Sequence, residues 1–175
     1  FDPDAGWELW IEAPIGDPEV LGPLLDALVR VGAGAKVRTG GVTADAFPDP
    51  DALTHFMAAC VTRDLIFKAT AGLHHPLRGE YRVTYEPGAE HVTMFGYLNL
   101  LLATAILRHG GTVDDAQAAL VERDASRLTF DAGGLRWRDF AFDTDYLGDL
   151  RRHGLASFGS CSFSEPVDEI GALFT

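Results

Sequence analysis

Three short segments of alternating hydrophobic and polar residues organise the chain. They are residues 7–14 (WELWIEAP), 35–41 (AKVRTGG) and 65–72 (LIFKATAG). Alternation with a period of two is typical of β-strands, and each segment ends in small or turn-forming residues. Between them, residues 17–31 and 49–60 carry apolar side chains at helical spacing, and each begins with Asp-Pro, which is typical of a helix start. The pattern predicts strand-helix-strand-helix-strand with short connections, and therefore a parallel sheet. Pro23 interrupts the first helical pattern and favours a helix start near Gly22.

The second half of the chain is less regular. We expect a long loop over residues 73–90 with a small hairpin at 81–85, followed by a buried helix over 91–108 that is apolar around most of its circumference. Residues 112–123 form another predicted helix, with Asp115 as the reciprocal cap of Thr112. A hairpin is predicted for 128–137 around Asp-Ala-Gly-Gly. A short helix at 146–152, a last strand at 156–163 and a helix from Ser164 complete the pattern.

Four parallel strands with covering helices predict an α/β fold of consecutive βα units. We interpret it as resembling half of a (β/α)8 barrel with a small β-hairpin insertion; a small open doubly wound sheet is the alternative. A complete barrel takes about 250 residues, more than the 175 present. Residues 1–175 are predicted to form a single α/β domain. Because the sequence begins without Met, it reads as the C-terminal part of a longer chain, a trimmed product or a processed one. Uncovered sheet edges predict a homo-oligomer or pairing with missing N-terminal sequence.

Charge and composition narrow the class of partner. The formal net charge of −12 argues against a nucleic-acid or anionic-membrane surface and favours a small-molecule ligand or another protein. The most apolar stretch, residues 97–107, is shorter than the roughly 20 residues that a membrane-spanning helix needs. Cys60 and Cys161 form no disulfide or zinc-ribbon pattern, so we expect reduced thiols and a cytoplasmic location.

The direction of the strand side chains predicts a site. In a parallel α/β sheet the helix-facing side must be apolar, which sends the polar residues of the first three strands to the opposite face. That face carries Glu12, Lys36, Arg38, Lys68 and Thr70. Lys36 and Lys68 are the only lysines, against twelve arginines. We expect these groups to converge near the carboxyl ends of the strands, where α/β enzymes bind ligands. The alternative is an ion-pair network that only neutralises itself.

Two later segments add candidate residues. The loop after the third strand carries His74, His75 and Arg78, which can supply acid–base chemistry or a metal ligand, with at most one of the adjacent histidines reaching a small site. The segment FGSCSFSEP runs through Gly159, Ser160 and Cys161 into a helix N-terminus, which suits a phosphate or carboxylate. Packing within the last strand is the favoured interpretation of Cys161, ahead of a nucleophile. For Asn99 in the buried helix, hydrogen bonding to the backbone is favoured over ligand contact.

Two resemblances accompany these residues. The segment KATAG at Lys68 resembles the K-T-S-T-G strand end of deoxyribose-phosphate aldolases, and AKVRTGG is loosely similar to the strand that bears the second lysine of that family, although the order is reversed. This resemblance implies that Lys68 forms a Schiff base and that Lys36 lowers its pKa. The combination of KATAGLHHP with FGSCSF.EP resembles a bacterial α/β protein family and implies no reaction.

The leading hypothesis is therefore a barrel-type enzyme, of the lyase or aldolase kind, that acts on a small anionic carbonyl or phosphorylated compound without a cofactor or metal. Its catalytic candidates are Lys68, Lys36, Glu12 and His74, and its substrate-binding candidates are Arg38, Thr70, His75, Arg78, Gly159, Ser160 and Cys161. A second hypothesis is a metal-dependent hydrolase or lyase with ligands among Glu12, His74, His75 and His91. A third is a non-catalytic ligand-binding or assembly domain.

Overall fold

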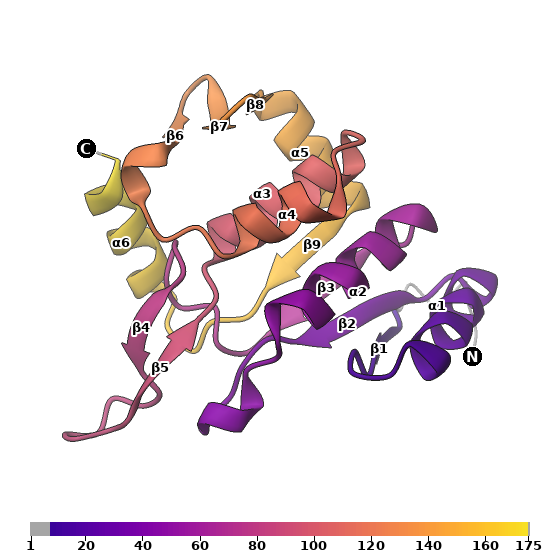
Figure 1. Ribbon diagram of the computed structural model, residues 1–175, viewed down its shortest axis with the longest axis horizontal. Helices are drawn as coiled ribbons and strands as arrows, with labels where there is room; N and C mark the ends of the chain where they lie inside the picture. The colour runs from indigo at the N-terminus through magenta and orange to yellow at the C-terminus, as the bar shows by residue number, and fades with distance from the viewer. Residues whose placement is uncertain (1–7, 175) are drawn as a thin grey trace.

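A four-stranded parallel sheet forms one side of the molecule, in the strand order β1-β2-β3-β9 (Figure 1). The computed structural model of the chain describes residues 8–174. Over these residues the sheet is open and does not close into a barrel. The predicted α/β class with a parallel sheet and alternating βα units is confirmed.

The first half of the chain folds as its pattern predicts. It contains β1 (Trp10–Glu12), α1 (Pro18–Val31), β2 (Gly34–Arg38), the short 3-10 helix η2 (Ala44–Ala46), α2 (Pro50–Thr62) and β3 (Phe67–Thr70). Asp17 and Asp49 cap the two helices by accepting hydrogen bonds from backbone N–H groups two residues later. The expected start of the first helix near Gly22 is wrong, because Pro23 lies inside α1. Its missing hydrogen bond is outweighed by the buried leucines of the same helix, Leu21, Leu25 and Leu28.

The register of the sheet places the charged residues as predicted. Lys36 is the Cα partner of both Glu12 on β1 and Lys68 on β3. The alternate residues of β2 and β3, Ala35, Val37, Phe67 and Ala69, are almost fully buried and join the core with α1 and α2. One face of the sheet is therefore apolar and helix-covered, while the other carries the lysines.

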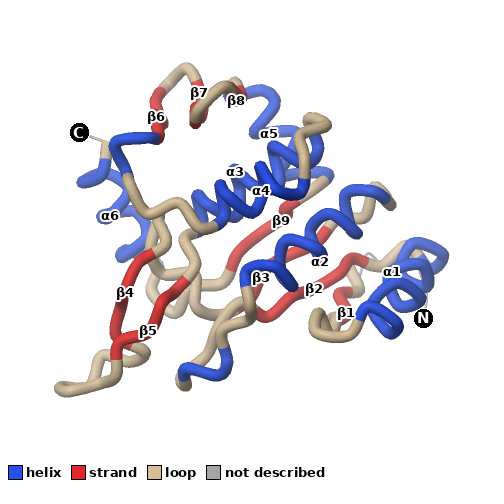
Figure 2. The backbone as a smooth tube through the Cα atoms, in the orientation of Figure 1, coloured by secondary structure: helices blue, strands red, loops and turns tan. Residues whose placement is uncertain are grey.

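The second half departs from prediction in several places. Its elements are β4 (Gly79–Arg82), β5 (His91–Met94), α3 (Tyr97–Arg108), α4 (Val113–Leu120), η3 (Ala125–Arg127), β6 (Leu128–Asp131), β7 (Gly134–Trp137), β8 (Phe140–Phe142), α5 (Thr144–His153), β9 (Leu155–Phe158) and α6 (Ser164–Leu173). The small hairpin is larger than expected, because β4 and β5 pair antiparallel across residues 79–94. Figure 2 shows the β6–β7–β8 sheet apart from the parallel sheet, with α3 and α4 between them.

His91 was predicted to begin the buried helix, and this is wrong. It begins β5, in which Val92 and Met94 are buried and His91 is exposed. The helix itself starts at Tyr97. Its N-cap residue is Gly96, which provides no side-chain hydrogen bond to the helix. The apolar run therefore contains a strand and a helix in succession, which hydrophobicity alone does not separate.

The start of α3 is a point where three segments meet. Asn99 is fully buried, and its amide group donates to the carbonyls of Ala119 and Glu122 and accepts from the N–H of Arg78. The favoured interpretation of Asn99 as a buried group bonded to backbone is thus confirmed. Gly96 is required here, since a Cβ at that position would lie 2.4 Å from both Leu77 and Pro76. Among residues 8–174, no helix is both long and apolar enough to cross a bilayer.

Replacing Asn99 tests how strongly this junction stabilises the fold. We expect Asn99→Ala to lower the free energy of unfolding by about 3 kcal/mol, because three backbone groups would lose their partner. Urea unfolding followed by circular dichroism measures the change. Thr104→Val is the matched control, because Thr104 is equally buried in α3. Its hydroxyl lies 2.7 Å from the carbonyl of Leu100 in the same helix and makes only a longer contact, 3.7 Å, with the sulfur of Met57, so we expect a loss below about 1 kcal/mol. Equal losses for the two variants would contradict the role assigned to Asn99.

Candidate functional site

Three of the predicted charges form an ion-pair group on the open face of the sheet. Lys36 Nζ lies 2.6 Å from Glu12 Oε2, and Arg38 Nε lies 3.6 Å from Glu12 Oε1. The hydrogen bond from Lys36 is the largest influence on the pKa of Glu12 and lowers it; the charges of Lys36 and Arg38 act in the same direction. The side chains are only partly covered, with 27% exposure for Lys36 and 41% for Glu12. The ion pairing expected for Glu12 is therefore present, and the ammonium group of Lys36 is engaged in it.

Lys68 has a different environment. Its Nζ lies 4.6 Å from the centre of the Trp10 ring, a cation–π contact across the sheet. Among residues 8–174, no carboxylate lies within ion-pair distance of it. Thr70, on the same strand, uses its hydroxyl to donate to the carbonyl of Val37. Thr70 is therefore part of the sheet's own hydrogen bonding.

A sharp turn directs the chain from β3 into the histidine pair. Ala71 and Gly72 both have positive φ, 67° and 75°. Gly72 packs against Gly40, where a Cβ would lie 2.9 Å from the backbone of the facing glycine. Thr39 donates its hydroxyl to the carbonyl of Ala71, 2.6 Å away. This turn places His74 and His75 beyond the carboxyl end of β3.

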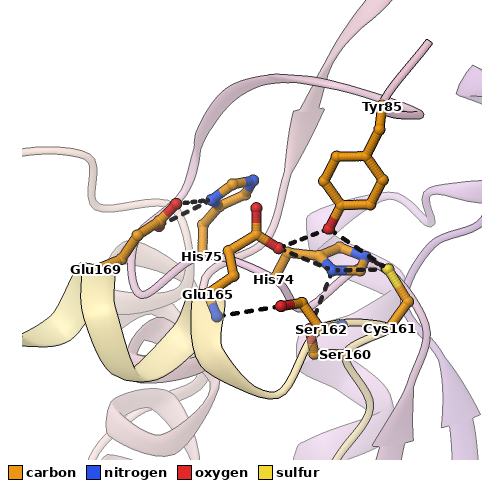
Figure 3. A network of polar contacts seen from close by, with 8 residues as sticks. All are labelled: His74, His75, Tyr85, Ser160, Cys161, Ser162, Glu165 and Glu169. Atoms are coloured by element: carbon orange, nitrogen blue, oxygen red, sulfur yellow. Dashed lines mark hydrogen bonds and ion pairs between the residues drawn. The ribbon is translucent and has the colours of Figure 1, made fainter.

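His74 meets the segment that follows β9. Its Nδ1 lies 3.0 Å from Ser160 Oγ and 3.5 Å from Cys161 Sγ (Figure 3). The carboxylate of Glu165, in the first turn of α6, lies 3.7 Å from the same nitrogen. Neighbouring parallel strands thus bring together an imidazole, a hydroxyl, a thiol and a carboxylate from positions about ninety residues apart.

The surroundings of His74 favour its neutral form. Burial is the largest influence on the pKa of His74 and lowers it from the ordinary value of 6.5, while the charge of Glu165 acts in the opposite direction. A neutral imidazole can accept a proton. Its contact with the thiol and its protonation state together make His74 a candidate base for Cys161.

Tyr85 closes this cluster from the β4–β5 hairpin. Its hydroxyl donates to Glu165 Oε2 at 2.9 Å and lies 3.7 Å from Cys161 Sγ. The contact with Cys161 is the largest cause of a raised pKa for Tyr85, followed by the hydrogen bond to Glu165. Tyr85 therefore keeps its proton and orients the carboxylate of Glu165.

His75 points to a different partner. Its Nδ1 lies 2.9 Å from both carboxylate oxygens of Glu169, and its ring stacks on Tyr81 with the centres 3.4 Å apart. Figure 3 shows Glu165 and Glu169 on one side of α6, toward the two histidines. The adjacent histidines therefore have different direct partners, although both line one small cavity.

Cys161 lies at the boundary of two hollows. A cavity of about 50 Å³ is lined by Cys161, both histidines, Tyr85, Glu165, Arg82 and neighbouring residues of the hairpin. A larger hollow of about 470 Å³ lies beside it, lined by Cys161 with Arg151, Ser157, Phe158, Ser160, Ser162, Phe163, Pro166 and Val167. Its volume is typical of a small-molecule site.

The favoured interpretation of Cys161 as a strand packing residue is wrong. The strand ends at Phe158, three residues earlier, and Cys161 is exposed. The glycine at 159 brings the end of β9 close to β3, since a Cβ there would lie 3.2 Å from Ala71 N. The backbone N–H of Gly159 donates to Ala69. The pairing of β9 with β3 thus ends where Cys161 turns toward His74.

Arg78 and His91 lie apart from the His74 cluster. Both line another hollow, of about 420 Å³, together with Glu80 and Phe95. The Arg78 guanidinium lies over the Phe95 ring at 4.8 Å, and its Nη1 is buried without a hydrogen-bond partner in the described part of the chain. Burial is the main cause of a lowered pKa for Arg78. The candidate residues therefore occupy three places rather than one.

The sequence interpretation missed Tyr85, Glu165, Glu169 and Arg151. The spacing of Glu165 and Glu169 was a usable signal, since residues four apart on a helix share a face. Tyr85 and Arg151 carried no such signal, because only the folded chain brings them to the hollows that Cys161 also lines. Comparisons of the chain with protein families, curated proteins and solved structures found no match.

Proposed function

We propose that the chain carries the active site of an enzyme that transfers or hydrolyses the acyl group of a small anionic compound. Cys161 is the nucleophile and His74 is its base. The observation that carries this proposal is the 3.5 Å contact between Cys161 Sγ and His74 Nδ1 beside the 470 Å³ hollow. A thiol in contact with a neutral imidazole is the pairing by which a general base activates a cysteine nucleophile, and the Glu165 carboxylate lies near the same ring nitrogen.

The reaction proceeds in two steps. The thiol proton passes to His74 as sulfur bonds to the acyl carbon and the carbonyl electron pair moves to oxygen. When that pair returns, the bond to the leaving group breaks, and His74 gives its proton to that group, which leaves a thioester on Cys161. Water then attacks the thioester, with His74 accepting its proton and returning it to the thiol. Glu165, 3.7 Å from His74 Nδ1, stabilises the imidazolium in both steps.

The larger hollow favours an anionic substrate. Arg151 donates one hydrogen bond to the carbonyl of Ala156, which leaves other N–H groups of the guanidinium for a carboxylate or phosphate. Hydroxyl groups of Ser157 and Ser160 line the same hollow, while Phe158 and Pro166 provide an apolar wall. The hollow thus combines a cationic end with an apolar side next to the thiol.

Activated esters test this mechanism. With mono-4-nitrophenyl succinate we expect release of 4-nitrophenol and a succinyl adduct on Cys161, detected by intact mass and peptide mapping. Cys60 is the internal control, since it is fully buried and its pKa is raised to about 12 by that burial. His74→Asn should slow acylation about 100-fold, because the base is lost. Arg151→Gln should lower the preference for the succinate ester over neutral 4-nitrophenyl acetate about fivefold.

Arg152→Gln is the matched control for Arg151, because Arg152 follows it on α5 but lines a different hollow, with Asp64 and Arg63. An equal effect of both arginine variants would mean that Arg151 contributes only long-range charge. Acylation that persists at full rate in Cys161→Ser would overturn the mechanism.

The lysines support a second candidate function, carbonyl chemistry of the lyase or aldolase type. Lys68 and Lys36 are direct neighbours on adjacent strands, and Lys68 contacts Trp10 rather than a carboxylate of the described residues. An amine in this position can form a Schiff base with an aldehyde or keto acid. The ion-pair group of Glu12, Lys36 and Arg38 lies beside it on the same face and supplies positive charge for an anionic substrate.

Borohydride trapping separates this candidate from the cysteine mechanism. With pyruvate or glyoxylate and borohydride, we expect a reduced adduct on Lys68, located by peptide mapping. Lys68→Arg should abolish the adduct, whereas Cys161→Ser should leave it unchanged. No adduct with a panel of small aldehydes and keto acids, on folded protein, would discard Schiff-base chemistry.

The open face of the sheet also suggests how the chain assembles. In this proposal the sheet is half of a (β/α)8-type barrel. A second copy of the chain covers the exposed face of the sheet when residues 1–175 are not joined to further sequence. The reduced cysteines agree with a cytoplasmic location. We expect light scattering to give about twice the 18.9 kDa mass of one chain. A monomer at all concentrations would contradict the pairing of two copies.

A further inference from the structure

A group of potential metal ligands lies next to the thiol–imidazole pair. It consists of His75, Glu165 and Glu169, and each offers one ligand atom such that these atoms all lie within 4.8 Å of one another. We propose that these three residues bind a divalent transition-metal ion. This inference shares Glu165 with the acyl-transfer mechanism, but it does not rest on that mechanism, because it uses neither Cys161 nor His74.

The distances suit a shared ion. Two ligands at about 2.1 Å from one ion are about 3.0 Å apart when their bonds are perpendicular and about 4.2 Å apart when they are opposite. The 2.9 Å between His75 Nδ1 and the Glu169 oxygens matches the perpendicular arrangement. Glu165 offers an oxygen within 4.8 Å of the other two ligand atoms, so only a small movement of its side chain is needed to reach the same ion.

Residues around the three proposed ligands hold their side chains in position. Stacking on Tyr81 fixes the plane of the His75 ring, and Tyr81 is itself held by a hydrogen bond from its hydroxyl to the carbonyl of Leu77. Tyr85 donates to one oxygen of Glu165. Glu165 and Glu169 are one helical turn apart on α6, so both carboxylates share its inward side. Such supporting contacts are typical of metal sites.

Charge and space favour a cation with open positions. Two carboxylates face one imidazole, which leaves the group of three side chains negative when the imidazole is neutral. The adjoining cavity of about 50 Å³ has room for more than one water molecule. Three protein ligands with water in the remaining positions are typical of catalytic rather than structural sites. One nitrogen and two carboxylate oxygens suit Zn²⁺, Mn²⁺ or Fe²⁺.

Metal titration of tag-free protein tests the proposal. After dialysis against a chelator, we expect one Zn²⁺ and, more weakly, one Mn²⁺ to bind per chain, measured by isothermal titration and elemental analysis. His75→Gln and Glu169→Gln should each weaken Zn²⁺ binding about 100-fold or more, since each removes a direct ligand. Glu169 is partly exposed, with 37% exposure of its side chain, so Glu169→Gln keeps the fold even if His75→Gln does not.

Two controls make the outcomes distinct. Glu86→Gln changes an exposed carboxylate of the β4–β5 hairpin that lies outside the group. Cys161→Ser removes the thiol. Both variants should bind Zn²⁺ as the unmodified protein does. Binding that survives Glu169→Gln but disappears in Cys161→Ser would place the ion on the thiol and overturn the proposal. If the unmodified protein does not bind Zn²⁺ or Mn²⁺ stoichiometrically, the proposal is wrong and His75 and Glu169 form an ion pair only.

Discussion

The position of the histidine pair depends on the first turn of α3. Backbone N–H groups at the start of a helix have no partner within it, and here those of Tyr97 and Leu98 donate to the carbonyls of His75 and Pro76. Asn99 fixes the next part of the same segment through Arg78. The hydroxyl of Tyr97 donates to the carbonyl of Pro166, which also ties α6 to this point. One helix end thus positions both the histidines and the glutamates that face them.

Local signals in the sequence were sufficient for the first half of the fold. Asp17 and Asp49 each precede a proline, and both helices start where these pairs predict. The alternation in β2 and β3 assigned Lys36, Arg38 and Lys68 to one face, because the period of two leaves no other choice once Val37 and Ala69 are buried. Pro23 misled the prediction because tertiary burial of α1 outweighs a local cost.

Only part of the candidate site could be predicted from the sequence, because its residues come from distant segments of the chain. His74 was a candidate from its place after β3, but its contact with Cys161 depends on β9 pairing with β3 and ending at Phe158. The predicted last strand ends at residue 163, five residues after the true end at Phe158, and this placed Cys161 within the strand as a packing residue. His91 was misplaced for a related reason: an apolar run does not show whether strand pairing or helix formation takes its first residues.

The adjacency of His74 and His75 has a mechanical consequence. Their ring centres are 6.2 Å apart at an interplanar angle of 60°, and each ring faces a different set of partners from α6 and the segment before it. One peptide unit joins the contacts of His74 to those of His75, and Glu165 lies near both rings. A ligand that displaces this peptide from one side changes the alignment on the other side in the same movement. The two side chains therefore cannot be repositioned separately by a movement of the backbone that carries them.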